Sequence, residues 1–167
     1  RRGASHIVVV DIIGSRLEKA LEVGADAVIN SAEEDVAARL VELHGDGATM
    51  MVRGTRSGSD IFLDAAGAPV VPQTVAGVAK SGAVLGIVAV HKKPVELDFG
   101  SILTTELTIV FAMGYPMEIF EVTDDIIENW QKYALIISDV LPFDRSLEAL
   151  ELAQTPGAAD KVVVRFD

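Results

Sequence analysis

The sequence predicts an α/β fold in which helices cover the faces of a mostly parallel sheet. Half of the 167 residues are hydrophobic, but only 5% are aromatic. Val, Ile, Leu and Ala therefore dominate the apolar residues, which favours a buried parallel sheet over an antiparallel sandwich rich in Tyr and Trp. Strand-like and helix-like segments also alternate along the chain. A chain of this length and apolar content can form one well-buried domain.

Short β-branched runs and helical periodicity give the order of the elements. Strands are predicted over residues 6–11, 27–29, 61–66, 83–90, 107–112 and 162–166. Helices are predicted over residues 15–23, 31–43, 71–79, 116–132 and 146–153. The continuous apolar run at 83–90 is typical of a strand that is buried on both faces. Residues 44–59 are rich in Gly, Arg and Thr and are predicted to form a long loop.

Local residue patterns indicate where the helices begin and end. Gly24 can adopt the left-handed conformation that stops the first helix. The sequence Ser31-Ala32-Glu33-Glu34 is typical of a capping box that opens the second helix. Pro116 stands near the start of the helix over 116–132, where its missing N–H is not needed. The buried face of the first helix is predicted to carry Leu17, Ala20 and Leu21.

The chain is predicted to contain two regions and to be the C-terminal part of a longer polypeptide. The residue pattern of the chain changes near residue 135. We therefore assign residues 1–135, with their alternating strands and helices, to a nucleotide-binding domain and residues 136–167 to a segment of another domain. A glycine-rich phosphate-binding turn is expected about 20 residues before the acid that ends the second strand of such a domain. Asp11 occupies that position only ten residues after Arg1. The first strand and its turn are therefore expected to precede this chain.

Composition excludes several classes of function. The net charge of −11 would repel nucleic acid and anionic membranes rather than bind them. No apolar run approaches the length of a membrane span. There is no cysteine, so the chain has neither a disulfide framework nor a thiolate metal site. Its three histidines lack the spacing of a metal site, and no serine nucleophile motif is present. We expect a cytoplasmic protein without catalytic or metal-ligating residues in this chain.

Asp11 is the strongest candidate for a functional residue. It ends the run Ile7-Val8-Val9-Val10-Asp11 and stands directly before a helical pattern. In a Rossmann-type doubly wound fold, an acid at this position accepts hydrogen bonds from an adenosine ribose and disfavours a 2′-phosphate. The alternative is that Asp11 only caps the following helix. Arg16 either lies over the adenosine or is a solvated helix residue.

Six short motifs resemble, in order and spacing, the zinc-containing medium-chain dehydrogenases. The likeness is greatest to the polyol and secondary-alcohol branch, such as butanediol and sorbitol dehydrogenases, and it runs over nearly all of the chain. The motifs are Asp11-Ile12-Ile13-Gly14-Ser15-Arg16-Leu17, Gly24-Ala25-Asp26-Ala27-Val28-Ile29-Asn30, Asp64-Ala65-Ala66-Gly67, Gly86-Ile87-Val88-Ala89-Val90, Leu141-Pro142-Phe143 and Asp160-Lys161-Val162-Val163.

The resemblance implies which residues contact the cofactor NAD. Asp11 and Arg16 stand at the adenosine ribose, and Lys161 stands near the pyrophosphate. Ala65 and Ala66 lie in the loop after the fourth strand, which passes along the cofactor. At the nicotinamide end, Val88, Ala89 and Val90 face the carboxamide, and Phe111 and Met113 lie beside them. In the family, the zinc ligands, the Gly-His-Glu segment and the glycine-rich turn all precede the start of this chain. The loop at 46–59 is longer than in most relatives.

The resemblance also implies the activity and the partners of the intact protein. We expect an NAD-dependent oxidoreductase that transfers a hydride between NAD and a secondary alcohol or polyol, with zinc bound outside this chain. This chain alone is expected to be inactive. Relatives pair their sixth strands across a two-fold axis. We therefore expect the protein to form a homo-oligomer through the strand over residues 107–112.

Two other functions are compatible with parts of the pattern. A non-catalytic nucleotide-sensing domain of a potassium transporter also has a strand that ends in Asp and a later Gly-Ala-Asp. Such domains lack the Leu-Pro-Phe segment and the terminal Lys-Val-Val strand. A zinc-free quinone reductase of the same superfamily usually prefers NADP and less often has an acid at position 11. Cysteine and Gly-His-Glu motifs upstream would distinguish the zinc dehydrogenase from both.

Overall fold

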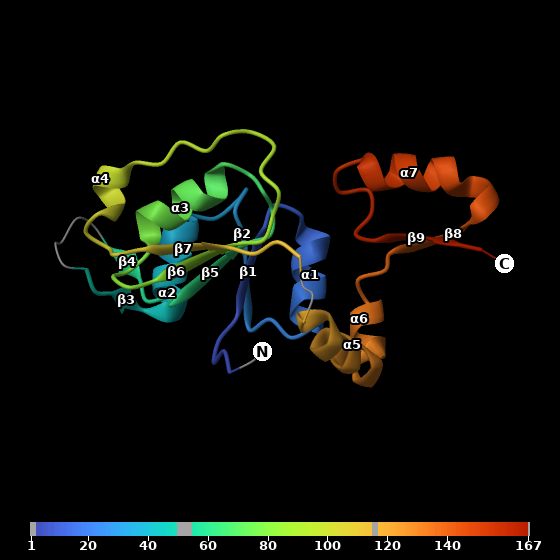
Figure 1. Ribbon diagram of the computed structural model, residues 1–167, viewed down its shortest axis with the longest axis horizontal. Helices are drawn as coiled ribbons and strands as arrows, with labels where there is room; N and C mark the ends of the chain where they lie inside the picture. The colour runs from blue at the N-terminus through green and yellow to red at the C-terminus, as the bar shows by residue number, and fades with distance from the viewer. Residues whose placement is uncertain (1–2, 50–54, 115–116, 167) are drawn as a thin grey trace. The chain divides into compact units, whose positions relative to one another are not determined.

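The computed structural model describes residues 3–49, 55–114 and 117–166 and has the predicted α/β character (Figure 1). The chain forms two compact units. Unit 1 comprises Arg1–Glu34 with Tyr115–Asp167, and unit 2 comprises Asp35–Gly114. The domain boundary near residue 135 stays a prediction. Among the described residues, no helix is long and apolar enough to cross a membrane.

In unit 1, the strands are β1 (Val8–Asp11), β2 (Ala27–Asn30), β8 (Asp139–Pro142) and β9 (Val162–Arg165). Its helices are α1 (Gly14–Glu22), α5 (Glu118–Glu128), α6 (Trp130–Ala134) and α7 (Ser146–Gln154), with a 3₁₀ turn at Phe143–Arg145. Unit 2 contains strands β3 (Asp46–Gly47), β4 (Arg56–Ser57), β5 (Ile61–Asp64), β6 (Val84–Ile87) and β7 (Thr108–Phe111). Its helices are α2 (Val36–His44), α3 (Val70–Val78) and α4 (Phe99–Ile102).

Parallel pairing confirms the predicted fold class. β1 pairs with β2, β6 pairs with both β5 and β7, and β8 pairs with β9, all in parallel. In the described part of the chain, β5, β6 and β7 form one three-stranded sheet, and β1–β2 and β8–β9 each form a two-stranded sheet. Parallel strands need a crossover connection, which explains why a helix follows most of these strands.

The first strand–helix–strand segment of unit 1 is close to its prediction. β1 runs beside β2 from the pair Val8 and Ala27 to the pair Asp11 and Asn30. Leu17 and Ala20 of α1 are buried, but Leu21 is 46% exposed, so its predicted burial is wrong. Gly24 has a φ of 105°, which confirms the left-handed stop after α1.

The predicted capping box does not form. Residues 31–34 lie in a turn, and α2 begins at Val36 with Asp35 as its N-cap. The Asp35 carboxylate accepts a hydrogen bond from the amide of Ala38. Glu34 does reach back, but its carboxylate accepts from the amide of Asn30 at 2.9 Å. Asp35, four residues after the predicted Ser31, is therefore the N-cap, because Ser and Asp both suit that position.

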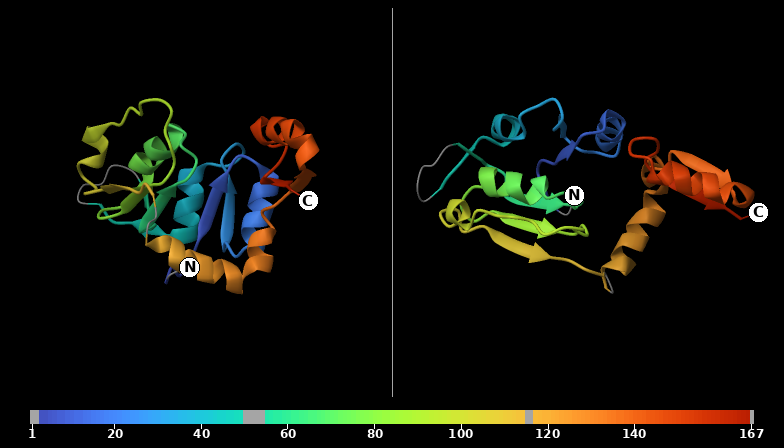
Figure 2. Two further views of the ribbon diagram at one scale, coloured as in Figure 1. Left: turned by 45° about the vertical axis from the view of Figure 1, so that its right-hand side comes forward. Right: turned by 90° about the horizontal axis from the view of Figure 1, so that it is seen from above.

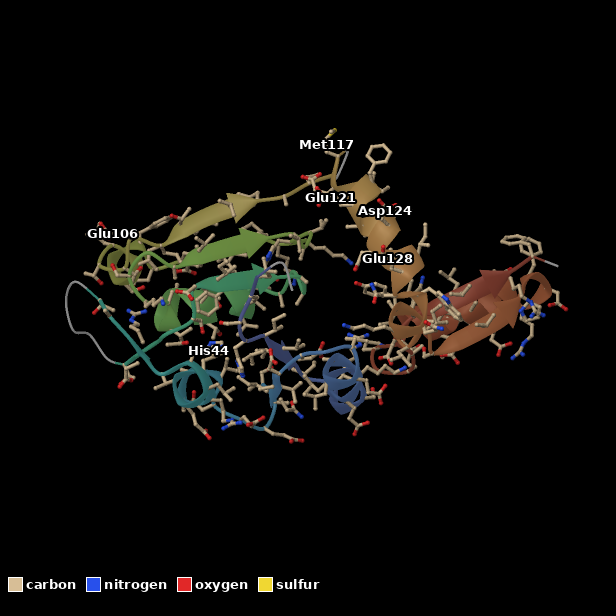
Figure 3. All side chains as sticks on the ribbon, turned by 90° about the horizontal axis from the view of Figure 1, so that it is seen from below. His44, Glu106, Met117, Glu121, Asp124 and Glu128 are labelled. Carbon is tan, nitrogen blue, oxygen red and sulfur yellow. The ribbon has the colours of Figure 1, made fainter. Side chains whose placement is uncertain are left out.

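The predicted helix over 116–132 is divided in two. α5 ends at Glu128, and α6 begins at Trp130 after Asn129, whose backbone is not helical. The Asn129 side-chain amide donates to the carbonyl and the carboxylate of Asp125, in addition to the hydrogen bond from its backbone amide to the same carbonyl. Pro116 lies outside the described residues. Acidic side chains line α5 at a spacing of three to four residues, as labelled in Figure 3: Glu121, Asp124 and Glu128.

The core of unit 2 lies between α3 and the sheet β5–β6–β7, as Figure 2 shows from above. Its buried residues are Val75, Ala79, Ala83 and Leu85, with Phe62, Ile87, Leu107 and Ile109 packed against them. Leu85 has no exposed surface and belongs to the central strand of the sheet. Burial of such a side chain contributes about 1.5–3 kcal/mol to folding.

Two predicted strands end earlier than expected. β5 ends at Asp64 instead of residue 66, and β6 ends at Ile87 instead of residue 90. Val88 and Val90 are 51% and 76% exposed, so the run that contains them is not buried on both faces along its whole length. Its apolar character continues into a loop beyond the sheet, which periodicity alone cannot distinguish from a buried strand.

The described parts of the predicted loop at 46–59 contain a short antiparallel pair. β3 pairs with β4 through Asp46 with Ser57 and Gly47 with Arg56. Arg56 is buried and donates from its guanidinium to the carbonyl of Ala76 in the last turn of α3 at 2.7 Å. A cation is favourable there because it faces the negative end of the helix dipole.

Candidate functional site

Most of the predicted cofactor-binding residues lie at or beyond the carboxyl ends of parallel strands. Ligands bind at this edge in doubly wound folds, because the loops there are the ones that diverge from the sheet. Lys161 differs, since it stands directly before β9. The others are Asp11 at the end of β1, Arg16 in the first turn of α1, Ala65 and Ala66 after β5, Val88, Ala89 and Val90 after β6, and Phe111 and Met113 at and after the end of β7.

The Asp11 carboxylate has one oxygen engaged by the backbone and one directed toward a cation. Its Oδ1 accepts hydrogen bonds from the amides of Ile12 at 2.7 Å and Ile13 at 3.0 Å. These amides belong to the turn before α1, whose N-cap is Ile13 and has no side-chain cap. Asp11 therefore shapes the approach to the helix rather than capping its first turn. Its Oδ2 lies 4.0 Å from Nη1 of Arg16.

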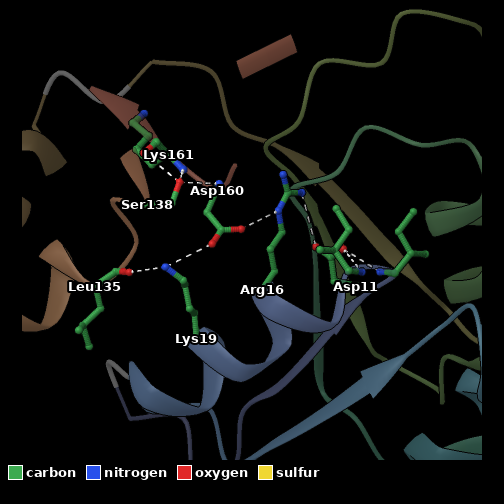
Figure 4. A network of polar contacts seen from close by, with 9 residues as sticks. Asp11, Arg16, Lys19, Leu135, Ser138, Asp160 and Lys161 are labelled. Atoms are coloured by element: carbon green, nitrogen blue, oxygen red, sulfur yellow. Dashed lines mark hydrogen bonds and ion pairs between the residues drawn. The ribbon is translucent and has the colours of Figure 1, made fainter. Parts of the chain in front are cut away.

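Arg16 also contacts a second carboxylate from a distant part of the sequence. Its Nε lies 3.5 Å from Oδ1 of Asp160, just before β9 (Figure 4). The other oxygen of Asp160 lies 3.3 Å from Nζ of Lys19, one turn further along α1. Lys19 Nζ also donates to the carbonyl of Leu135 at 3.0 Å. Sequence reasoning missed Asp160 and Lys19 because no local pattern joins residues so far apart in the chain.

Ser138 fixes the backbone that carries Asp160 and Lys161. Its Oγ accepts from the amide of Asp160 at 2.9 Å and from that of Lys161 at 3.3 Å. Arg16 and Lys161 both line an open cavity of about 340 Å³ in unit 1. Its other lining residues are Ala153, Gln154, Thr155, Pro156, Ala159, Asp160 and Val162. The structure thus brings the predicted Arg16 and Lys161 to one cavity, and Asp11 next to Arg16.

In unit 2, a buried carboxylate holds the loop that follows β5. Asp64 has no exposed surface, and its Oδ1 accepts hydrogen bonds from the amides of Ala66 at 3.0 Å and Gly67 at 2.9 Å. Its Oδ2 lies 2.7 Å from Nε2 of His91, which follows β6. Only 16% of the His91 side chain is exposed. A histidine soon after an apolar strand, opposite an aspartate that ends another, is the signal that could have indicated this pair.

The loops after β5 and β6 are in direct contact. The amides of Val88 and Ala89 donate to the carbonyl of Asp64 at 3.0 and 3.1 Å. Gly67 has a φ of 67°, and a Cβ there would lie 2.8 Å from the carbonyl oxygen of Val90. Only glycine permits this close approach of the two loops. The apolar side chains at and beyond the strand ends remain exposed: Val88, Val90, Phe111 and Met113.

A separate hydrogen-bonded group stabilises the start and end of the predicted 46–59 loop. Ser59 Oγ lies 2.7 Å from Nδ1 of His44 and 2.6 Å from Oγ of Ser57, and both serines are buried. Nearby, Lys80 Nζ contacts the carboxylate of exposed Asp60 at 2.5 Å. The hydrogen bond from Lys80 and its charge hold the pKa of Asp60 below the ordinary value. These contacts stabilise the loop at 46–59, and a structural role accounts for them.

No cluster of three or more His, Cys, Asp or Glu side chains that could hold a metal ion is found among the residues that the structure describes. The arrangement instead offers hydrogen-bond acceptors, cations and exposed backbone at strand ends. Such a set can bind and orient a nucleotide.

Residues 1–129 match the family model of the zinc-binding dehydrogenases, and the chain belongs to this family. Sorbitol dehydrogenase of Bombyx mori is 29% identical over 166 residues, which cover 97% of this chain and 44% of that enzyme. An alcohol dehydrogenase of Thermotoga maritima has the same fold, with a TM-score of 0.83 and 22% identity over 99% of this chain and 44% of that one. A short chain alcohol dehydrogenase of Escherichia coli, solved with NADH, gives a TM-score of 0.77 and 24% identity over 98% of this chain and 45% of that one.

The chain therefore spans less than half the length of the relatives that it matches. The family confirms the predicted resemblance to zinc-containing dehydrogenases, and the structural matches confirm the Rossmann-like fold. The roles of the individual site residues stay predictions.

Proposed function

We propose that this chain is the NAD-binding portion of a zinc-dependent dehydrogenase that acts on a secondary alcohol or polyol. One observation carries the proposal: Asp11 ends a parallel strand of a chain that belongs to the zinc-binding dehydrogenases, and its Oδ2 is directed toward Arg16. The sorbitol dehydrogenase relative and the NADH-bound structural match support the substrate class and the cofactor. They favour this function over a zinc-free quinone reductase or a nucleotide-sensing domain.

The described residues of unit 1 suit the adenosine end of NAD. The Asp11 carboxylate accepts hydrogen bonds from the ribose hydroxyls, and its negative charge repels a 2′-phosphate. The side chain is 29% exposed, so a ligand can reach it. Arg16 lies beside this position, and Lys161 supplies a further cation in the adjoining cavity for the pyrophosphate.

Unit 2 contributes the loops that we assign to contacts with the rest of the cofactor. Asp64 and Gly67 hold the loop of Ala65 and Ala66 against the segment that follows β6. The backbone of Val88, Ala89 and Val90 is proposed to face the nicotinamide carboxamide. Phe111 and Met113, which are 77% and 96% exposed, are proposed to line the same end.

Zinc is proposed to bind outside this chain, as the resemblance to the zinc-containing dehydrogenases implies. In the intact enzyme zinc would polarise the substrate alcohol and lower its pKa, and bound NAD would supply the hydride acceptor. This chain contributes position and electrostatics to the cofactor. We therefore propose that the chain by itself has no dehydrogenase activity, and that the intact protein is a cytoplasmic homo-oligomer that pairs through β7.

Binding of reduced dinucleotides to the intact polypeptide that contains this chain tests the proposal. NADH fluorescence should increase on binding, and titration should give a Kd for NADH at least tenfold lower than that for NADPH. Oxidation of sorbitol or another secondary alcohol should require NAD and be lost when a chelator removes zinc. If neither NADH nor NADPH binds, the proposed function is wrong.

A further inference from the structure

The Arg16 guanidinium is shared between two carboxylates with different surroundings. Its Nη1 lies 4.0 Å from Asp11 Oδ2, whereas its Nε lies closer, at 3.5 Å, to Asp160 Oδ1. The Asp11 and Arg16 side chains are 29% and 42% exposed, but only 16% of the Asp160 side chain is exposed. The less hydrated carboxylate therefore has the shorter contact, and ion pairs away from solvent are screened less.

Asp160 is held in place from two sides. Ser138 Oγ accepts from its backbone amide at 2.9 Å, and Lys19 Nζ lies 3.3 Å from its second carboxylate oxygen. Lys19 is itself fixed through its hydrogen bond to the carbonyl of Leu135. Arg16 and Lys19 stand one turn apart on α1, so both cations are directed to the same acid (Figure 4). Asp160 is thus a fixed partner for Arg16.

The charges at this place balance. Within the set joined by these ion pairs, Arg16 and Lys19 supply two positive charges and Asp11 and Asp160 supply two negative ones. Lys161 lies outside this set, in the adjoining cavity. In doubly wound folds an arginine near the ribose-binding acid can accommodate the 2′-phosphate of NADP. Arg16 is placed to do so, but its Nε faces Asp160 and its charge is already compensated. Without Asp160, the same place would carry an excess positive charge beside the ribose position.

We propose that Asp160 determines cofactor specificity through Arg16, by holding the guanidinium so that its charge does not attract a 2′-phosphate. Discrimination against NADP then comes from two acids: Asp11, which faces the ribose, and Asp160, which contacts Arg16. Asp160 is a positioning residue, since it acts on the dinucleotide through Arg16. The inference rests on the proposed function, because it concerns the same nucleotide site.

Replacement of the carboxylate by an isosteric amide tests the proposal in the intact polypeptide. For Asp160→Asn, we expect the Kd of NADPH to fall roughly fivefold, the range of a broken, partly exposed ion pair, while the Kd of NADH changes less than twofold. Asp160→Glu, which keeps the charge, should retain most of the wild-type ratio. In an Arg16→Gln background, Asp160→Asn should no longer change the ratio of the two Kd values.

A matched control separates this effect from a general change of charge. Glu151→Gln also removes one negative charge from the C-terminal segment, but Glu151 is exposed and makes no ion pair in the described part of the chain. It should leave the ratio unchanged. Equal weakening of NADH and NADPH by Asp160→Asn would assign Asp160 a purely structural role and overturn the proposal. An unchanged ratio would overturn it as well, while the proposed function would stand if the wild type still binds NADH. If the wild type binds neither dinucleotide, both fail.

Discussion

His91 Nε2 lies 2.7 Å from Asp64 Oδ2, and the Asp64 carboxylate has no exposed surface. Asp64 ends β5 and His91 follows the neighbouring parallel strand β6, so this contact joins the loops that extend from the two strands. The other oxygen of Asp64 receives two backbone amides of its own loop. One buried carboxylate thus holds the loop after β5 and contacts the loop after β6, at the edge of the sheet where we propose that part of the cofactor binds.

Asp64→Ala should destabilise the protein strongly. It removes the acceptor for two backbone amides and for His91, and a buried donor left without an acceptor costs about 1–3 kcal/mol. Urea denaturation should show a loss of at least this size in the free energy of unfolding. Asp98→Ala is the control, because Asp98 accepts two similar amides but is exposed at the start of α4. Its loss should be nearer 1 kcal/mol, and equal losses would show that burial of Asp64 is unimportant.

Gly67→Ala should also destabilise the protein, for a steric reason. The added Cβ would meet the backbone carbonyl of Val90 at 2.8 Å, and a φ of 67° is unfavourable for alanine. We expect a loss of about 1–3 kcal/mol. Gly77→Ala offers the opposite control, since nothing lies within 4 Å of its Cβ position in α3. It should stabilise the helix by about 0.5–1 kcal/mol. Thermal unfolding should therefore show a lower Tm for Gly67→Ala and a higher Tm for Gly77→Ala.

The sequence predicts the parallel α/β fold well because its signals are local. The run that ends at Asp11 and the left-handed Gly24 each act within a few residues, and both are found where expected. The strand ends were less predictable, since exposed Val88 and Val90 look like a continued strand when no loop signal interrupts the apolar run. The capping box failed for a related reason: Ser31 and Asp35 are both good caps, and the sequence does not rank them.

The polar contacts at the candidate site could be predicted only in part. The resemblance places Asp11 and Arg16 at the ribose position, and their ion pair agrees with a common location. It does not indicate that Arg16 also meets Asp160, or that His91 meets buried Asp64. Such pairs depend on how distant segments pack. The positions of Asp64 and His91 at the ends of two apolar strands only hint at their contact, and nothing in the local sequence joins Arg16 to Asp160.

The ion pair between Asp60 and Lys80 should make stability depend on pH. Lys80 lowers the pKa of Asp60 in the folded state from the ordinary value of 3.8. A group with a lowered pKa in the folded state stabilises the protein above its unfolded-state pKa, and this contribution is lost as the pH falls through the folded-state pKa. The Tm difference between wild type and Asp60→Asn should therefore be present at pH 7 and shrink below about pH 4. Asp46→Asn, at an exposed acid without an ion pair in the described residues, should show no such trend.

Asp11→Ser tests the ribose role directly. Loss of a charge-assisted hydrogen bond and of repulsion toward the 2′-phosphate should narrow the preference for NAD over NADP by about 1–3 kcal/mol. Steady-state KM values for both cofactors, measured on the intact enzyme, give the ratio. If the KM values do not change, Asp11 serves only to hold the turn through Ile12 and Ile13.

β7 should form the interface of the proposed homo-oligomer. In the described part of the chain it pairs only with β6, so its other edge can pair with a second copy. Val110 and Phe111 on this strand are 48% and 77% exposed, and burial of such side chains would add to the pairing. Val110→Lys places a charge on the strand and should shift the mass measured by light scattering from a dimer or larger species toward the monomer. Leu147→Lys on α7, a residue that is also 77% exposed, should leave the mass unchanged. A wild-type protein that is monomeric at high concentration would show that β7 does not pair in solution.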